Sequence, residues 1–366
     1  MRRDAADNPA RPADGRNGSD PSGRGAVVWA SGAQAESVPA LLDACGLEAI
    51  AAGAPDGTER ELAGRLGCAP IEDLRGAIGS VEAAAFLLLD AGDFGDREDA
   101  RDAEAVRRAA ERGALIVSAS PLPASLPELA GGRWQRSERG LRPIEHVRLA
   151  PLPRRSRVWP EVAELLADLI ATHGPSDSAR LACVAPPGTT RPGLALLGAV
   201  DLLEALLGEP ELIDAAKVGG RPDRRGRRSL SRLTGAIHAL ARTADGRAAT
   251  LVAGAARGGW AWSAHAEGPW GSIEVTPAGF ALRATGADAP DHRLLEPGPA
   301  DLDEPWASLA WYVRTRLASG GQPDAPLDIN ALVCAADAAL LSAATGEAAS
   351  PQTARRAIDP GHAGLW

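Results

Sequence analysis

A chain of 366 residues, 45% of them hydrophobic, is too long for one typical core and has enough apolar residues for two folded domains. Its formal net charge of −9 argues against nucleic acid or an anionic membrane as the main partner, because both are themselves negatively charged. No apolar run reaches the roughly 18 residues of a membrane-spanning helix, and no cysteine pair has C-x-x-C spacing. We therefore expect a cytoplasmic protein with plain buried thiols.

Residues 1–25 have almost nothing to bury and are interpreted as a disordered tail. From 26 to 122, short apolar runs alternate with helix-like stretches that end at Gly46, Gly67 and Gly113. This alternation predicts a Rossmann-like, doubly wound parallel sheet with right-handed crossovers. The expected elements are strands at 26–31, 47–52, 84–89 and 114–117, and helices at 33–45, 56–66 and 97–112.

After residue 122 the pattern changes. Short strand-like runs between 233 and 283 are separated by turn signals such as Asp245-Gly246, which indicate an antiparallel sheet. We expect an α+β domain with a large antiparallel sheet at 123–325, then a helix at 326–350 that packs back on the first domain. Residues 351–366 would form a tail. The other expected helices lie at 159–173, 194–207, 302–317 and 328–344.

Several segments occur in an order that is typical of one family. They are Cys45 to Ile50 followed by Pro55-Asp56, the L-L-G-x-P segment from Leu206, the hairpin from Trp270 to Val275, and the late helix from Asp337 to Glu347. Together they resemble the Gfo/Idh/MocA oxidoreductases, the family of glucose-fructose oxidoreductase and inositol dehydrogenase, over most of 26–350. The resemblance implies a Rossmann-like cofactor domain, NAD(P) as cofactor and a sugar or polyol as substrate.

The cofactor loop of this family, G-x-G-x-x-G after the first strand, is poorly matched. Its glycines let backbone N–H groups approach the pyrophosphate at a helix N-terminus. In the most natural register of the sequence, Trp29, Ser31 and Gln34 stand at the glycine positions and only Gly32 lies nearby. The acidic position after the second strand falls on Ala54. We therefore favour the absence of a bound cofactor over ordinary NAD(P) binding.

The catalytic positions implied by the resemblance have also changed. Ala119-Ser120-Pro121 stands where the family has E-K-P, and the only lysine of the chain, Lys217, lies far away in the sequence. The family's D-x-G-x-H-x-x-D helix falls on residues 194–201, where only Asp201 keeps its type. The plainer interpretation of Asp201 is a carboxylate on a helix surface.

Few residues therefore remain as candidates for a site. No two histidines have metal-ligand spacing, so we predict no metal site. The candidates for proton transfer are Ser118, Ser120 and Asp201, and those for cofactor contact are Gly32, Asp56 and Asp90.

Three further features each have two interpretations. Asp90, Asp93 and Asp96 follow a predicted strand at the ligand-binding edge of the sheet and form either a cation or polyol site or a polar loop. The basic run at 221–228 contacts phosphates or carboxylates, or is a solvated loop. The tryptophans of the antiparallel sheet either stack on a sugar-like ligand or belong to the core or a homo-oligomer interface; they are Trp260, Trp262 and Trp270.

Two functions follow as hypotheses. The favoured one is a pseudoenzyme, a homologue of sugar or polyol oxidoreductases that has lost the usual cofactor and catalytic motifs and acts as a binding, regulatory or partner subunit. The alternative is an active NAD(P)-dependent sugar or polyol oxidoreductase with a rearranged site. Nicotinamide nucleotide binding separates them, because only the enzyme requires it.

Overall fold

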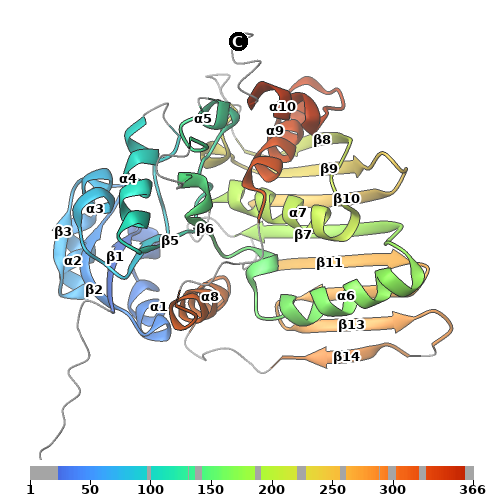
Figure 1. Cartoon of the computed structure of the whole chain (residues 1–366), viewed down its shortest axis with the longest axis horizontal. Helices are drawn as coiled ribbons and strands as arrows, with labels where there is room; N and C mark the ends of the chain where they lie inside the picture. The colour runs from blue at the N-terminus through green and yellow to red at the C-terminus, as the bar shows by residue number, and fades with distance from the viewer. Residues whose placement is uncertain are drawn as a thin grey trace, which may run out of the picture.

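The computed structural model places two sheets side by side, with helices packed on both (Figure 1). The structure describes residues 24–96, 100–130, 132–136, 142–185, 191–220, 228–255, 261–287, 289–295, 302–320 and 327–358. Residues 1–23 of the expected tail and 221–227 of the basic run lie outside these ranges, whereas Gly25, expected in the tail, begins the first strand. No helix in the described ranges is both long and apolar enough to cross a membrane.

The first domain contains a six-stranded sheet in the order β3-β2-β1-β4-β5-β6, in which all neighbours are parallel. This order confirms the Rossmann-like fold predicted from the alternating pattern. The sequence analysis missed β3 and β6, because each has only three residues and shows no periodicity. The strands are β1 (Gly25–Trp29), β2 (Glu48–Gly53), β3 (Ala69–Ile71), β4 (Ala85–Leu88), β5 (Leu115–Ser118) and β6 (Val147–Leu149).

Helices connect these strands and several end as predicted. Gly46 and Gly67 follow α1 and α2 with φ of 71° and 67°, the left-handed conformation that glycine adopts without strain. Asp73 caps α3, a helix that the sequence analysis did not predict. The helices are α1 (Val38–Cys45), α2 (Glu59–Leu66), α3 (Leu74–Ser80), α4 (Ala100–Glu111) and α5 (Leu126–Ala130), with a 3₁₀ turn, η2, at Gly32–Gln34.

The second domain is built on an eight-stranded sheet in the order β14-β13-β12-β11-β7-β10-β9-β8. All neighbours are antiparallel except β7 and β10, so the sheet is mixed and mostly antiparallel. The strands are β7 (Ser178–Ala185), β8 (Leu212–Val218), β9 (Ala236–Arg242), β10 (Ala248–Ala255), β11 (Ala261–Gly268), β12 (Gly271–Thr276), β13 (Gly279–Ala284) and β14 (Asp291–Leu294).

Helices α6 (Trp159–His173), α7 (Pro192–Leu207) and α9 (Ile329–Thr345) lie in front of the large sheet in Figure 1. α7 packs on β7 and β10, and nearly all its side chains are buried. Its apolar residues are spread around the whole helix and not along one stripe, as expected for a helix that is covered on all sides.

The structure differs from the expectation for the last helices. α8 (Trp306–Ala318) packs on α1 and β5 of the first domain, while α9, the helix expected there, contacts α5 of that domain but packs mainly on the second. α9 packs on β8 and α7 because its many alanines allow a close approach to the sheet, and its buried residues surround the helix. Residues 351–358, expected in a tail, form α10 (Pro351–Ile358) against α9.

Candidate functional site

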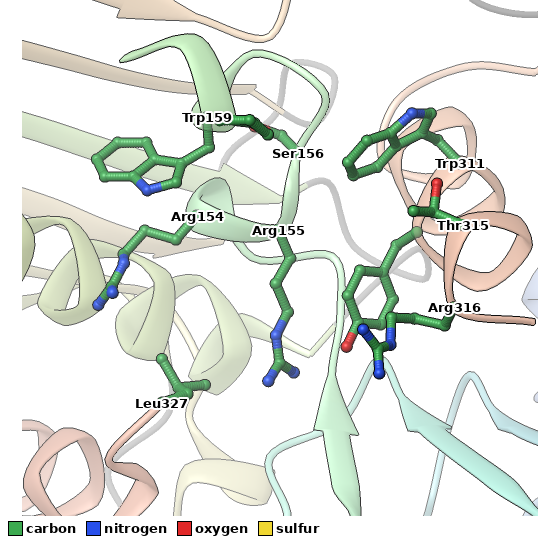
Figure 2. A pocket seen from close by; sticks show the side chains of 10 residues that line it. Arg154, Arg155, Ser156, Trp159, Trp311, Thr315, Arg316 and Leu327 are labelled. Carbon is green, nitrogen blue, oxygen red and sulfur yellow. The ribbon is translucent and has the colours of Figure 1, made fainter. Parts of the chain in front are cut away.

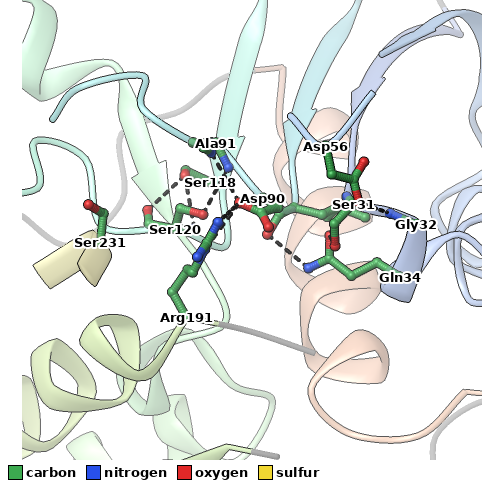
Figure 3. Close-up of polar contacts among 12 residues, drawn as sticks. Ser31, Gly32, Gln34, Asp56, Asp90, Ala91, Ser118, Ser120, Arg191 and Ser231 are labelled. Carbon is green, nitrogen blue, oxygen red and sulfur yellow. Dashed lines mark hydrogen bonds and ion pairs between the residues drawn. The ribbon is translucent and has the colours of Figure 1, made fainter. Parts of the chain in front are cut away.

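The carboxyl ends of β1, β4 and β5 meet at one edge of the parallel sheet, between the two domains. In a doubly wound sheet this edge, where the strand order reverses, is where ligands bind. Figure 3 shows that the loops here bring together Gly32, Asp56, Asp90, Ser118 and Ser120, five of the six residues chosen from the sequence. The sixth, Asp201, lies elsewhere.

The loop after β1 has a different register from the one inferred from the sequence. Trp29 is the last residue of β1 and pairs with Gly53 of β2, and a methyl group added to Gly53 would collide with its ring. The tight turn is therefore Ala30-Ser31, and Gly32 begins the following 3₁₀ turn. The three glycine positions correspond to Ala30, Gly32 and Ala35, one residue later than expected, and Trp29 does not occupy the turn.

The backbone N–H of Gly32 is already hydrogen-bonded within the chain. It donates to Asp56 Oδ2 at 2.8 Å, and Thr58 Oγ1 donates to Asp56 Oδ1 at 2.6 Å. Partial burial pushes the pKa of Asp56 up, but these bonds from Thr58 and Gly32 outweigh it and hold the pKa below its usual value. A carboxylate therefore sits on the N–H that would face a pyrophosphate in a dinucleotide-binding loop.

The side chain of Gln34 links the loop after β1 to the residue that follows β4. Its Oε1 accepts from the backbone N–H of Ser31 at 3.0 Å, and its Nε2 donates to the carbonyl oxygen of Leu89 at 3.1 Å. Only 4% of Gln34 is exposed. In this structure Asp56 therefore engages the N–H donor of Gly32, and Gln34 links Ser31 to Leu89 beside it.

The aspartates after β4 are bound by arginines of the second domain. Arg191, just before α7, donates to Asp90 Oδ1 from Nη2 at 2.6 Å and from Nε at 3.1 Å. Arg232 donates to Asp96 Oδ2 at 3.0 Å, and Ser229 Oγ donates to its Oδ1 at 2.5 Å. Within the described ranges, no group of three His, Cys, Asp or Glu residues is arranged to hold a metal ion.

These bonds make the β4–α4 loop a contact between domains, which favours the polar-loop interpretation over the cation site. The sequence analysis missed both arginines. It offered no signal for them, since Arg191 lies 101 residues from its partner.

Ser118 and Ser120 are buried, and their hydroxyl groups shape the turn after β5. Ser118 Oγ donates to the carbonyl oxygen of Ser120 at 2.7 Å and accepts from its N–H at 3.1 Å. Ser120 Oγ accepts from the N–H of Ala91 at 3.0 Å. Both hydroxyls are thus engaged by the backbone beside Asp90.

Asp201 is fully buried on α7, so its interpretation as a helix-surface carboxylate is wrong. Burial raises its pKa to about 6, against the opposing charges of Arg154 and Arg155. Arg154 Nη1 donates to its Oδ1 at 3.1 Å. The sequence could not show this burial, because it depends on the turn that carries Arg154, 47 residues away.

The position implied for the catalytic histidine is tightly packed in this structure, so a side chain there would require Pro153 to shift. Gly198 occupies it, and a Cβ there would lie 3.1 Å from Pro153 Cδ and 3.5 Å from Cys183 Sγ. The only lysine, Lys217, is on β8 at the edge of the large sheet. Gly198 and Ser120 thus stand at the positions that the resemblance assigns to the histidine and the lysine.

The fold is shared with solved oxidoreductases. A levoglucosan dehydrogenase in complex with NADH and L-sorbose superposes with a TM-score of 0.62 at 15% identity, over 89% of this chain and 98% of that one. An oxidoreductase from Agrobacterium radiobacter in complex with NAD+, L-tartaric acid and magnesium gives 0.63 at 15% identity, over 90% and 99%. GenD2 from gentamicin A biosynthesis, in complex with NAD, gives 0.58 at 18%, over 89% and 96%.

No protein-family model matches the chain, and no curated protein matches its sequence. At these identities the likeness establishes the fold. It is the fold of the Gfo/Idh/MocA-type NAD-binding oxidoreductases, as the sequence resemblance implied.

Proposed function

We propose that this chain keeps the fold of a sugar or polyol oxidoreductase without using NAD(P) as its structural neighbours do. It acts instead as a ligand-binding, regulatory or partner subunit. The hydrogen bond between the N–H of Gly32 and the carboxylate of Asp56 is the observation that carries this proposal.

A pyrophosphate would have to displace this carboxylate. Asp56 is attached to the same domain, so it competes as an internal anion at a high effective concentration. Gln34 would also have to leave Leu89 and Ser31 before a dinucleotide could cross from β1 to β4. Both costs are subtracted from the binding energy of the nucleotide.

The positions for proton transfer support the same proposal. Gly198 is packed against Pro153, and the hydroxyls of Ser118 and Ser120 are held by the backbone. Changes at three separate places on one fold are more consistent with relaxed selection on catalysis than with a single altered step.

The second candidate is an active NAD(P)-dependent sugar or polyol oxidoreductase with a rearranged site. It is favoured by the small residues Ala30, Gly32 and Ala35 in the corrected register and by neighbours that hold NADH with L-sorbose or levoglucosan. In that case Gly32, Asp56 and Asp90 would contact the cofactor, and the three proton-transfer candidates named from the sequence would act on the substrate.

We also propose that two copies of the chain, in the cytoplasm, meet through the large sheet. Exposed apolar side chains on its outer strands support this, namely Val218 on β8, Leu240 on β9 and Leu294 on β14. Trp262 and Trp270 are buried, which favours their interpretation as core residues over sugar stacking. Trp260 lies outside the described residues.

Calorimetric titration of the purified protein with NADH and with NADPH tests the proposal. We expect no saturable binding at millimolar nucleotide. Micromolar binding would overturn the proposal and favour the active oxidoreductase, for which a screen of sugars and polyols would then be justified.

A further inference from the structure

A pocket lies between the start of α6 and helix α8, away from the loops that follow β1 and β4. Its volume is about 160 Å³, which is below the roughly 300–1,000 Å³ of sites for drug-sized ligands. Thr315 and Trp311 form its partly exposed side, so a small molecule can reach it from solvent. The rest of the lining is Arg154, Arg155, Ser156, Trp159, Pro160, Tyr312, Arg316 and Leu327.

Positive side chains predominate in the lining of this pocket. Arg154, Arg155 and Arg316 contribute three guanidinium groups, and no carboxylate is among the described residues that line it. In Figure 2 the guanidinium groups of Arg155 and Arg316 reach toward each other from two separate elements, and that of Arg154 extends to one side. A guanidinium has five N–H donors in a planar fork, so the one bond from Arg154 to Asp201 leaves it donors for an anion.

A hydrogen bond and an aromatic contact fix the side chain of Arg155 at the pocket. Arg155 Nη1 donates to the carbonyl oxygen of Leu149 at 2.8 Å, and its guanidinium carbon lies 5.3 Å from the ring centroid of Tyr312. The N-terminal end of α6 adds partial positive charge, since its cap residue Val158 makes no side-chain hydrogen bond to it. A negative ligand would therefore meet donors that are already in place.

The remaining walls are aromatic. Trp159 and Trp311 lie on opposite sides of Ser156 in Figure 2, and Tyr312 completes the lining. Indole and phenol rings bury flat apolar groups well while their rims stay polar. Guanidinium groups beside such rings suit a ligand with an anionic head and a flat body.

We propose that this pocket binds a small organic carboxylate with a flat, apolar body. The carboxylate would be held by the arginine forks and the body would lie between the aromatic rings. The site uses no residue of the loops that follow β1 and β4. It therefore goes beyond the proposed function and stands whether or not the chain binds a dinucleotide.

Calorimetry with benzoate as the probe tests the proposal, with benzyl alcohol as its neutral counterpart and inorganic phosphate as a bare anion. We expect saturable benzoate binding that is at least about tenfold tighter than that of either comparison ligand. The fluorescence of Trp159 and Trp311 should change over the same concentrations. No saturable benzoate binding, or equal binding of benzyl alcohol or phosphate, would overturn it.

Two variants locate the site. Thr315→Trp fills the pocket from its exposed rim without removing a charge, and Arg316→Gln removes one guanidinium; each should weaken benzoate binding about tenfold or more. Arg314→Gln makes the same charge change on the exposed part of α8 outside the pocket and should leave binding unchanged. If Arg316→Gln does not fold, Thr315→Trp alone tests whether benzoate binds in this pocket. Unchanged binding in Thr315→Trp, or an equal loss in Arg314→Gln, refutes the assignment.

Discussion

Replacing Asp56 changes dinucleotide binding in opposite directions under the two candidate functions. If its carboxylate blocks the loop, Asp56→Ala frees the N–H of Gly32 and strengthens NADH binding. If the carboxylate instead holds the ribose hydroxyls, as acidic residues after the second strand do in dinucleotide-binding folds, the same change weakens binding. The sign of the effect is therefore decisive.

The expected change in the free energy of NADH binding for Asp56→Ala has two contributions. A carboxylate about 4 Å from a phosphate charge repels it by about 1 kcal/mol in water, and this low value applies because Asp56 is exposed. The freed N–H gains a charge-assisted hydrogen bond worth about 1.5–3 kcal/mol. Together these give about 2.5–4 kcal/mol, or a roughly 70- to 900-fold tighter complex for Asp56→Ala.

Asp56→Asn separates the two contributions. The amide oxygen of asparagine can still accept from Gly32, so only the charge repulsion is lost and binding should tighten about fivefold. Asp43→Ala, an exposed position at the far end of α1, makes the same charge change and should have no effect.

The assay is calorimetric titration with NADH of the wild type and the three variants, after circular dichroism has shown equal melting temperatures. The order wild type, Asp56→Asn, Asp56→Ala in rising affinity is expected. Binding that is unchanged or weaker in Asp56→Ala would refute the argument that this carboxylate closes the loop.

Two further predictions concern stability. Burial raises the pKa of Glu204 to about 8, helped by the nearby charges of Asp201, Asp328 and Glu209. Stability should therefore fall as pH rises from about 4.5 to about 8, because over this range the carboxyl is ionised in the unfolded chain but still protonated in the folded one. Glu204→Gln should lose less stability as the pH rises, and at pH 8 it should be more stable than the wild type by on the order of 1–3 kcal/mol. Urea melts at several pH values measure this, and the same pH dependence of the unfolding free energy in both proteins would contradict the prediction. Gly193→Ala would place a methyl group on the carbonyl oxygen of Leu230 and should lower the free energy of unfolding by about 3 kcal/mol or more. Gly64→Ala, whose added methyl group would have nothing within 4 Å, should instead raise it by about 0.5–1 kcal/mol. Equal melting temperatures of the two variants would refute the packing argument.

Elements with a strong local signal could be predicted from the sequence. The uninterrupted apolar run at 84–89 is β4, buried throughout, and α6 has the bounds that its periodicity indicated. Short elements such as β3 could not be predicted, because their conformation depends on the neighbouring strand. The main partners of α8 and α9 could not be predicted, because periodicity shows that a face is apolar and not what covers it.

The same division holds for the site. Sequence alone determined which residue types stand in the loops after β1 and β2, including Gly32 and Asp56, and it predicted that the lysine and histidine of the resembled family are replaced. Only the tertiary structure decided that Asp56 bonds to Gly32 across 24 residues, and that Arg191 bonds to Asp90. It also shifted the loop register by one residue, because the pairing of Trp29 with Gly53 fixes where β1 ends. Residue type is local information, whereas the partner of a charge or a donor depends on which distant segments the sheets bring together.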